Sequence, residues 1–145
     1  MTPYDFSRFE NQQRDTYATA LREITNGLKV THWMWYIFPQ VAGLGKGERA
    51  RHFAIVGIEE ARAYLADRAL GPRLEACAEA VLAVVGRTAT DIFGTTDAKK
   101  LRSCATLFAA VTPSGSVFDR VLAKYFDGRR DELTLRALNA DIAET

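Results

Sequence analysis

The chain has 145 residues, of which 48% are hydrophobic and 26% are charged, and this is the balance of an ordinary globular domain. Its 19 basic and 18 acidic residues leave a formal net charge of +1, far from the excess of a dedicated nucleic-acid-binding protein. We therefore predict a single domain over residues 1–145, and we do not expect nucleic acid as a partner.

The N-terminal residues have no basic segment followed by an apolar one, and no stretch of about 18 apolar residues occurs in the sequence. The two cysteines, Cys77 and Cys104, fall on apolar helical stripes, and their spacing is not that of metal ligands. We therefore expect a soluble cytoplasmic protein with buried free thiols, without membrane association, cofactor or structural metal. The sequence leaves the oligomeric state open.

Apolar residues in the N-terminal half follow helical spacing, although less regularly than in the second half. A first short helix carries Phe6 and Phe9, and a second helix ends at Gly27, where glycine permits the turn. Two further helices are predicted over residues 48–56 and 58–66.

The C-terminal half reads as one helix after another. In chain order we predict a helix over 72–85, a short turn capped by Thr88 and Asp91, a helix over 97–111, a helix from Ser116 to Gly128, and a last helix capped by Asp131. No run alternates apolar and polar residues between turn signals, so a substantial sheet is not expected. The prediction is an all-α, compact multi-helix domain with roughly seven to eight helices and one irregular, aromatic-rich segment.

That segment covers residues 31–40, THWMWYIFPQ, and holds both tryptophans of the chain. Pro39 favours extended backbone at Phe38, so the segment either ends a short helix or runs extended into the following loop. Its rings have two interpretations, and the sequence leaves both open. They are core anchors, or some of them form a platform for a planar group such as a nucleobase.

In the second interpretation, Trp33, Trp35 and Tyr36 stack on the ligand, and His32 or Gln40 forms hydrogen bonds with its edge. His32 is also the candidate for proton transfer, although a single histidine is more often structural.

A glycine-rich loop follows, with Gly43, Gly45 and Lys46 just before a predicted helix start at Glu48. Free backbone amides and the lysine side chain can converge there on an anion. The loop matches neither a P-loop nor a dinucleotide-binding fingerprint, and its alternative role is a flexible connection with a solvated lysine. The basic residues within 99–102 are expected to form a solvated helix face.

Together, the aromatic segment and the loop predict a small phosphorylated ligand, nucleotide-like or ADP-ribose-like, that is bound or processed. The alternative is a noncatalytic interaction domain in which part of the aromatic segment is exposed and docks a protein. Exposure of the rings separates the two, because a ligand needs a concave pocket and a docking partner needs a flat apolar patch.

Residues 32–40, followed by Gly43-Leu44-Gly45, resemble the signature of a small bacterial family of unknown function. Further matches are EARAYL at 60–65, LGPRL at 70–74, DIFG at 91–94 and KLRS at 100–103, so the likeness spans nearly the whole chain. The resemblance implies a compact all-α domain and carries no activity or catalytic residue.

Members of that family often carry the label "calpastatin", but calpain-inhibiting segments are disordered chains, whereas this composition is that of a prefolded globule. A fainter similarity, in the order of elements only, links the chain to proteins that act on ADP-ribose or related N-glycosides.

Overall fold

The computed structural model describes the backbone of residues 4–144 and the side chains of residues 4–139. This part of the chain forms helices and no strand, which confirms the all-α prediction. The helices number nine in the described residues, slightly more than predicted. They are α1 (Ser7–Thr25), α2 (Met34–Ile37), α3 (Glu48–His52), α4 (Gly57–Ala66), α5 (Leu70–Ala83), α6 (Ala89–Phe93), α7 (Thr95–Ala109), α8 (Val117–Phe126) and α9 (Glu132–Glu144).

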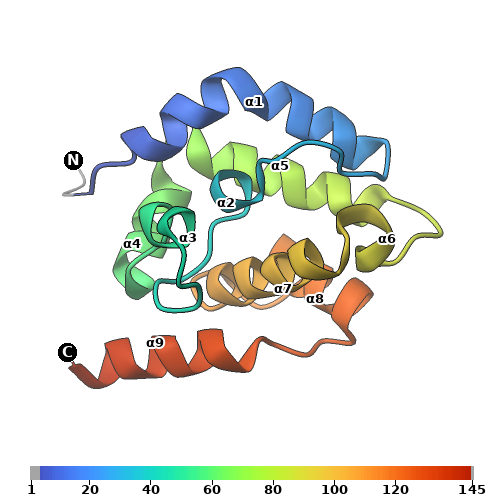
Figure 1. Cartoon of the computed structure of the whole chain (residues 1–145). Coiled ribbons are helices and arrows are strands. Elements are labelled where there is room, and N and C mark those ends of the chain that lie inside the picture. The colour runs from blue at the N-terminus through green and yellow to red at the C-terminus, as the bar shows by residue number, and fades with distance from the viewer. Residues whose placement is uncertain (1–3, 145) are drawn as a thin grey trace.

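The helices pack in pairs around one apolar core. Helix α1 lies across α5, α5 and α7 both pack on α8, and α9 runs along α4 and α7 (Figure 1). The short helix α2 is held beneath α1, in the middle of the view. None of the described helices is both long and apolar enough to cross a membrane.

Two N-terminal predictions are wrong in their boundaries. Helix α1 is continuous where two helices were predicted, and the polar Gln13 that interrupts its apolar stripe is buried. Its Nε2 donates hydrogen bonds to the Tyr36 carbonyl, at 2.7 Å, and to the Tyr64 hydroxyl, at 3.2 Å. Helix α3 ends at His52, because the backbone around Ile55 instead pairs with residues 40–42 as an isolated parallel bridge.

The C-terminal helix starts agree with the caps seen in the sequence. Thr88 and Asp91 form a reciprocal capping box on α6. The Ser116 hydroxyl accepts the amide of Asp119 at the start of α8, and Asp131 Oδ2 accepts the amide of Thr134 at 3.0 Å in α9. Helices α5 and α7 begin two residues before their predicted starts.

Both cysteines are buried free thiols, as predicted. Burial raises the pKa of the Cys77 thiol to about 12 and raises that of Cys104 well above its usual range. Neither thiol is activated as a nucleophile, because burial disfavours the thiolate.

Gly71 sets how closely α5 approaches the end of α4. A Cβ atom at this position would lie 2.0 Å from the Leu65 carbonyl oxygen and 2.8 Å from its carbonyl carbon. Backbone atoms cannot rotate away, so any side chain here forces the two helices apart.

We expect Gly71→Ala to lower the free energy of unfolding by about 2 kcal/mol or more, because the inserted methyl overpacks a buried contact. Urea unfolding monitored by circular dichroism measures this loss. Gly47→Ala is the matched control, since a Cβ at Gly47 meets nothing within 4 Å. Its stability should change by less than about 1 kcal/mol, because the weaker helix cap and the stiffer unfolded chain oppose each other. Equal stability of Gly71→Ala and the unmodified protein would contradict the close-approach explanation.

Candidate ligand-binding site

The Glu23 carboxylate on α1 fixes the path of the segment that leads into α2. Glu23 Oε1 accepts hydrogen bonds from the backbone amides of Val30, at 2.8 Å, and Thr31, at 3.0 Å, and from the Trp33 indole N–H, at 2.9 Å. Its Oε2 accepts the Thr31 hydroxyl at 2.7 Å. Burial alone would raise the pKa of Glu23, but these hydrogen bonds outweigh it and lower the pKa to about 2.

Most rings of the aromatic segment are core residues. Trp33 has 0% of its surface exposed and packs against Phe38 and Phe93, with ring centroids 6.3 and 6.4 Å apart. Tyr36 is also buried and packs on Phe53, with ring centroids 5.3 Å apart. The structure therefore places two of the three predicted stacking rings inside the protein. Trp35 differs from them because it is half-buried and faces a hollow.

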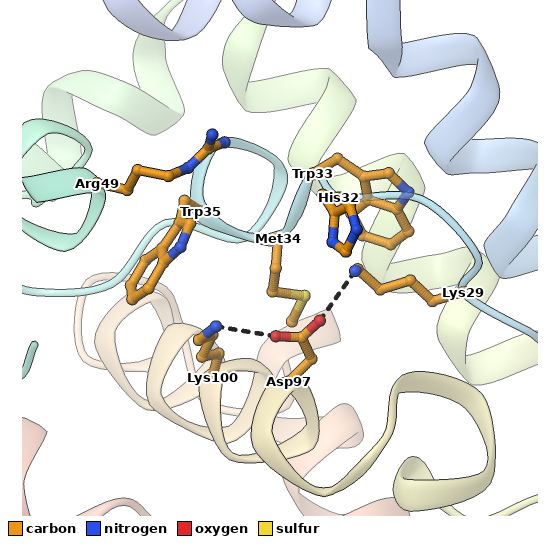
Figure 2. A pocket seen from close by; sticks show the side chains of 8 residues that line it. All are labelled: Lys29, His32, Trp33, Met34, Trp35, Arg49, Asp97 and Lys100. Atoms are coloured by element: carbon orange, nitrogen blue, oxygen red, sulfur yellow. Dashed lines mark hydrogen bonds and ion pairs between the residues drawn. The ribbon is translucent and has the colours of Figure 1, made fainter. Parts of the chain in front are cut away.

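That first hollow has a volume of about 240 Å³ and is bounded by α2, the segment before α2, α3 and the start of α7 (Figure 2). Its lining contains three cations and a single carboxylate, so it holds a formal excess of two positive charges when His32 is neutral. The lining residues are Lys29, His32, Trp33, Met34, Trp35, Arg49, Asp97 and Lys100.

Asp97 holds two of these cations together. Lys29 Nζ lies 2.9 Å from one carboxylate oxygen and Lys100 Nζ lies 3.0 Å from the other (Figure 2). Burial would raise the pKa of Asp97, but the hydrogen bonds and charges of both lysines outweigh it and lower the pKa. The carboxylate is therefore ionised, and each ammonium group keeps further N–H donors for another acceptor.

Each lysine also lies against an indole ring. Lys29 Nζ is 5.0 Å from the ring centroid of Trp33, and Lys100 Nζ is 4.2 Å from that of Trp35. Such cation–π contacts hold the ammonium groups in place without neutralising them. The result is a row of contacts with an indole ring at each end and the two lysines and Asp97 between them, which connects α2 and the segment before it with α7.

A second hollow, of about 340 Å³, shares Trp35 and Lys100 with the first. Gly45 belongs to its wall, and a Cβ there would lie 2.5 Å from the Ala50 Cβ, so glycine is needed for this close packing. The lining residues are Trp35, Gln40, Leu44, Gly45, Thr96, Lys99, Lys100, Ser103, Asp131 and Leu133.

The residues predicted from the sequence thus fall into separate groups. His32 and Trp35 line the first hollow, and Gln40 and Gly45 line the second. Gly43 and Lys46 line neither; both are exposed, and the Lys46 carbonyl accepts a hydrogen bond from the Arg51 guanidinium. Helix α3, which follows this loop, has only five residues, so its dipole would attract an anion only weakly.

Sequence reasoning missed the residues that carry the charge of the first hollow, namely Lys29, Arg49, Asp97 and Lys100. The sequence predicts a solvated helix face for Lys100, whereas the structure places this lysine at the hollow. The local signal for part of this group is the spacing of Asp97 and Lys100 by three residues on one helix, which permits an ion pair. No local pattern brings Lys29 to the same carboxylate.

These features define an all-helical protein with a basic hollow beside a half-buried tryptophan. Residues 3–138 match the model of the family described as "Protein of unknown function (DUF1810)", and the chain belongs to this family. Its fold is similar to that of the conserved hypothetical protein Rv1873 from Mycobacterium tuberculosis, with a TM-score of 0.92 and 42% sequence identity over 95% of this chain and 99% of that one. No curated protein matches the chain.

We expect Glu23→Gln to lower the free energy of unfolding at pH 7 by about 2 kcal/mol, because a neutral amide oxygen accepts hydrogen bonds less strongly than a carboxylate, and the amide nitrogen is a donor that cannot replace the second carboxylate oxygen as an acceptor. The pKa of Glu23 is lowered in the folded protein from 4.5 to about 2, so its contribution is complete above pH 4.5 and is lost as the pH falls toward 2. Urea unfolding at pH 7, 4 and 3 should therefore show a difference between the two proteins that shrinks with acidity. The exposed Glu59→Gln is the control, and a constant difference across this range would contradict the role of the carboxylate charge.

Proposed function

We propose that this protein binds a small phosphorylated ligand in the first hollow. The observation that carries the proposal is the excess of positive charge around Asp97, because two lysines share that one carboxylate. Arg49 adds a third cation, and it has no ion-pair partner among the residues that the structure describes. An anion entering the hollow would meet several N–H donors already held in place.

The lysines are poised for an external acceptor. The side chain of Lys29 is only 8% exposed, so its ammonium group is largely removed from water, and the Trp33 ring holds its position. Charges that are partly desolvated attract an anion more strongly than charges on an open surface, because the effective dielectric constant around them is lower. His32 at the same hollow offers an additional hydrogen-bond donor and is the candidate for proton transfer if the ligand is also processed.

The burial of the aromatic segment supports a ligand rather than a docked protein. Docking requires several exposed rings in one patch, but only Trp35 among the four rings between residues 33 and 38 is more than marginally exposed. A single flat ring beside a basic hollow fits a nucleotide-like ligand better, because its base can stack while its phosphate contacts the cations.

Inorganic pyrophosphate is the simplest probe of the charged hollow. We expect calorimetric titration to show binding at low ionic strength that weakens as salt is added. Lys100→Met should raise the dissociation constant about tenfold or more, since it removes a charged donor and retains the apolar stem.

Two variants locate the anion. Arg62→Met removes a cation from an exposed ion pair on α4 and controls for net charge. Lys46→Met tests the glycine loop, and we expect both variants to bind like the unmodified protein. Absence of pyrophosphate binding, or loss of binding in Lys46→Met but not in Lys100→Met, would contradict the proposed site.

A further inference from the structure

A third hollow, of about 310 Å³, adjoins the first one at Arg49. Arg49 lines both hollows, and it stands on the α3 side of the first (Figure 2). The residues that line the third hollow are Gln12, Glu48, Arg49, His52 and Phe53. They come from α1, from α3 and from the residue after α3, so the third hollow lies between these two helices, next to the cations of the first.

The first hollow is small for a complete ligand. Sites that hold small molecules usually have volumes of about 300 to 1,000 Å³. The first hollow has a volume of about 240 Å³, and three cations take part in its lining. These cations suit a phosphate group, so the rest of a ligand bound there would extend into a neighbouring hollow.

The polar side chains of the third hollow are open to a ligand. The side chains of Gln12, Glu48 and His52 are exposed and form no hydrogen bond or ion pair with another residue that the structure describes. They offer a carboxylate that accepts, an amide that donates and accepts, and an imidazole. The charges of Glu48 and Arg49 balance, so the third hollow is formally neutral when His52 is neutral. Such a lining suits hydroxyl groups better than a second anion.

The second hollow is less suited to hydroxyl groups. The carboxylate oxygen Asp131 Oδ2 already accepts the amide and the hydroxyl of Thr134, at 3.0 and 2.6 Å. The other side chain there with an amide group, Gln40, is buried. The carboxylate in the second hollow is therefore engaged by the protein, whereas the one in the third hollow is open.

We infer that the ligand is a sugar phosphate, with its phosphate among the cations around Asp97 and its hydroxyl groups in the third hollow, at Glu48 and Gln12. This inference rests on the proposed function, because it assumes that the anion occupies the first hollow. The Arg49 guanidinium has five N–H donors, so it can contact the phosphate and a sugar hydroxyl together. Glu48 is a specificity-determining residue in this arrangement, because its charge accepts hydroxyl groups and repels a second phosphate.

Methyl phosphate is the matched ligand control, because it carries the same phosphate group without hydroxyls. The test compares it with ribose 5-phosphate, glucose 6-phosphate and glycerol 3-phosphate by calorimetric titration. We expect at least one of these three to bind about tenfold more tightly than methyl phosphate, since hydrogen bonds from hydroxyls to a carboxylate supply this difference.

The variant Glu48→Met separates recognition of hydroxyls from an effect of charge. It removes the acceptor and one negative charge and keeps a similar length. We expect it to remove most of the advantage of the sugar phosphate without weakening methyl phosphate, whereas an effect of charge alone would strengthen the binding of every anion. Gln12→Met should remove part of the advantage. Glu59→Met, which changes an exposed acid on α4 in the same way, should preserve it.

The outcomes separate the two proposals. If pyrophosphate binds and none of the three hydroxylated phosphates binds more tightly than methyl phosphate, the inference about the sugar is wrong and the anion site stands. If Glu48→Met keeps the full advantage, or weakens methyl phosphate and the sugar phosphate equally, Glu48 does not recognise hydroxyls and the inference is also wrong. If neither pyrophosphate nor any of the four monoesters binds, the proposed function itself is wrong.

Discussion

Four hydrogen bonds to one buried carboxylate, that of Glu23, determine the path of the chain between α1 and α2. A charged acceptor binds backbone amides more strongly than a neutral one, and the low pKa of Glu23 expresses this preference. The same hydrogen bonds orient the Trp33 indole, which packs in the core. One of them comes from the backbone amide of Val30, the residue that follows Lys29. These hydrogen bonds to Glu23 therefore connect the aromatic core to the position of Lys29, one of the cations that line the first hollow.

Asp97 has the corresponding role on α7. It brings an ammonium group from the segment before α2 and another from its own helix to one carboxylate. A single acid cannot neutralise two bases, so the hollow stays positive although the whole chain is almost neutral. The concentration of charge at one place, rather than net charge, is the basis for the proposed anionic ligand.

The two buried glutamines differ in how their amide nitrogens are paired. Gln13 donates to the Tyr36 carbonyl and the Tyr64 hydroxyl, so its amide nitrogen joins α1, α2 and α4. Gln40 is held as firmly by its backbone, but its amide nitrogen contacts no acceptor in the described part of the chain. The amide nitrogen of Gln13 thus joins three helices, whereas among the described residues the Gln13 Oε1 and the Gln40 Nε2 are both buried without a hydrogen-bond partner.

The sequence by itself determined the helical class, the caps at Thr88, Ser116 and Asp131, and the unusual aromatic segment, because helical periodicity and capping are properties of neighbouring residues. It also predicted Trp35 and Gln40 as ligand contacts, together with rings that the fold buries, and the ligand-binding role of these two residues stays a prediction. Only the tertiary structure decided which rings are core, because burial depends on what α1 and α6 place above and beside them. It alone brought Lys29 to Asp97, since no pattern of local spacing encodes a contact between distant segments.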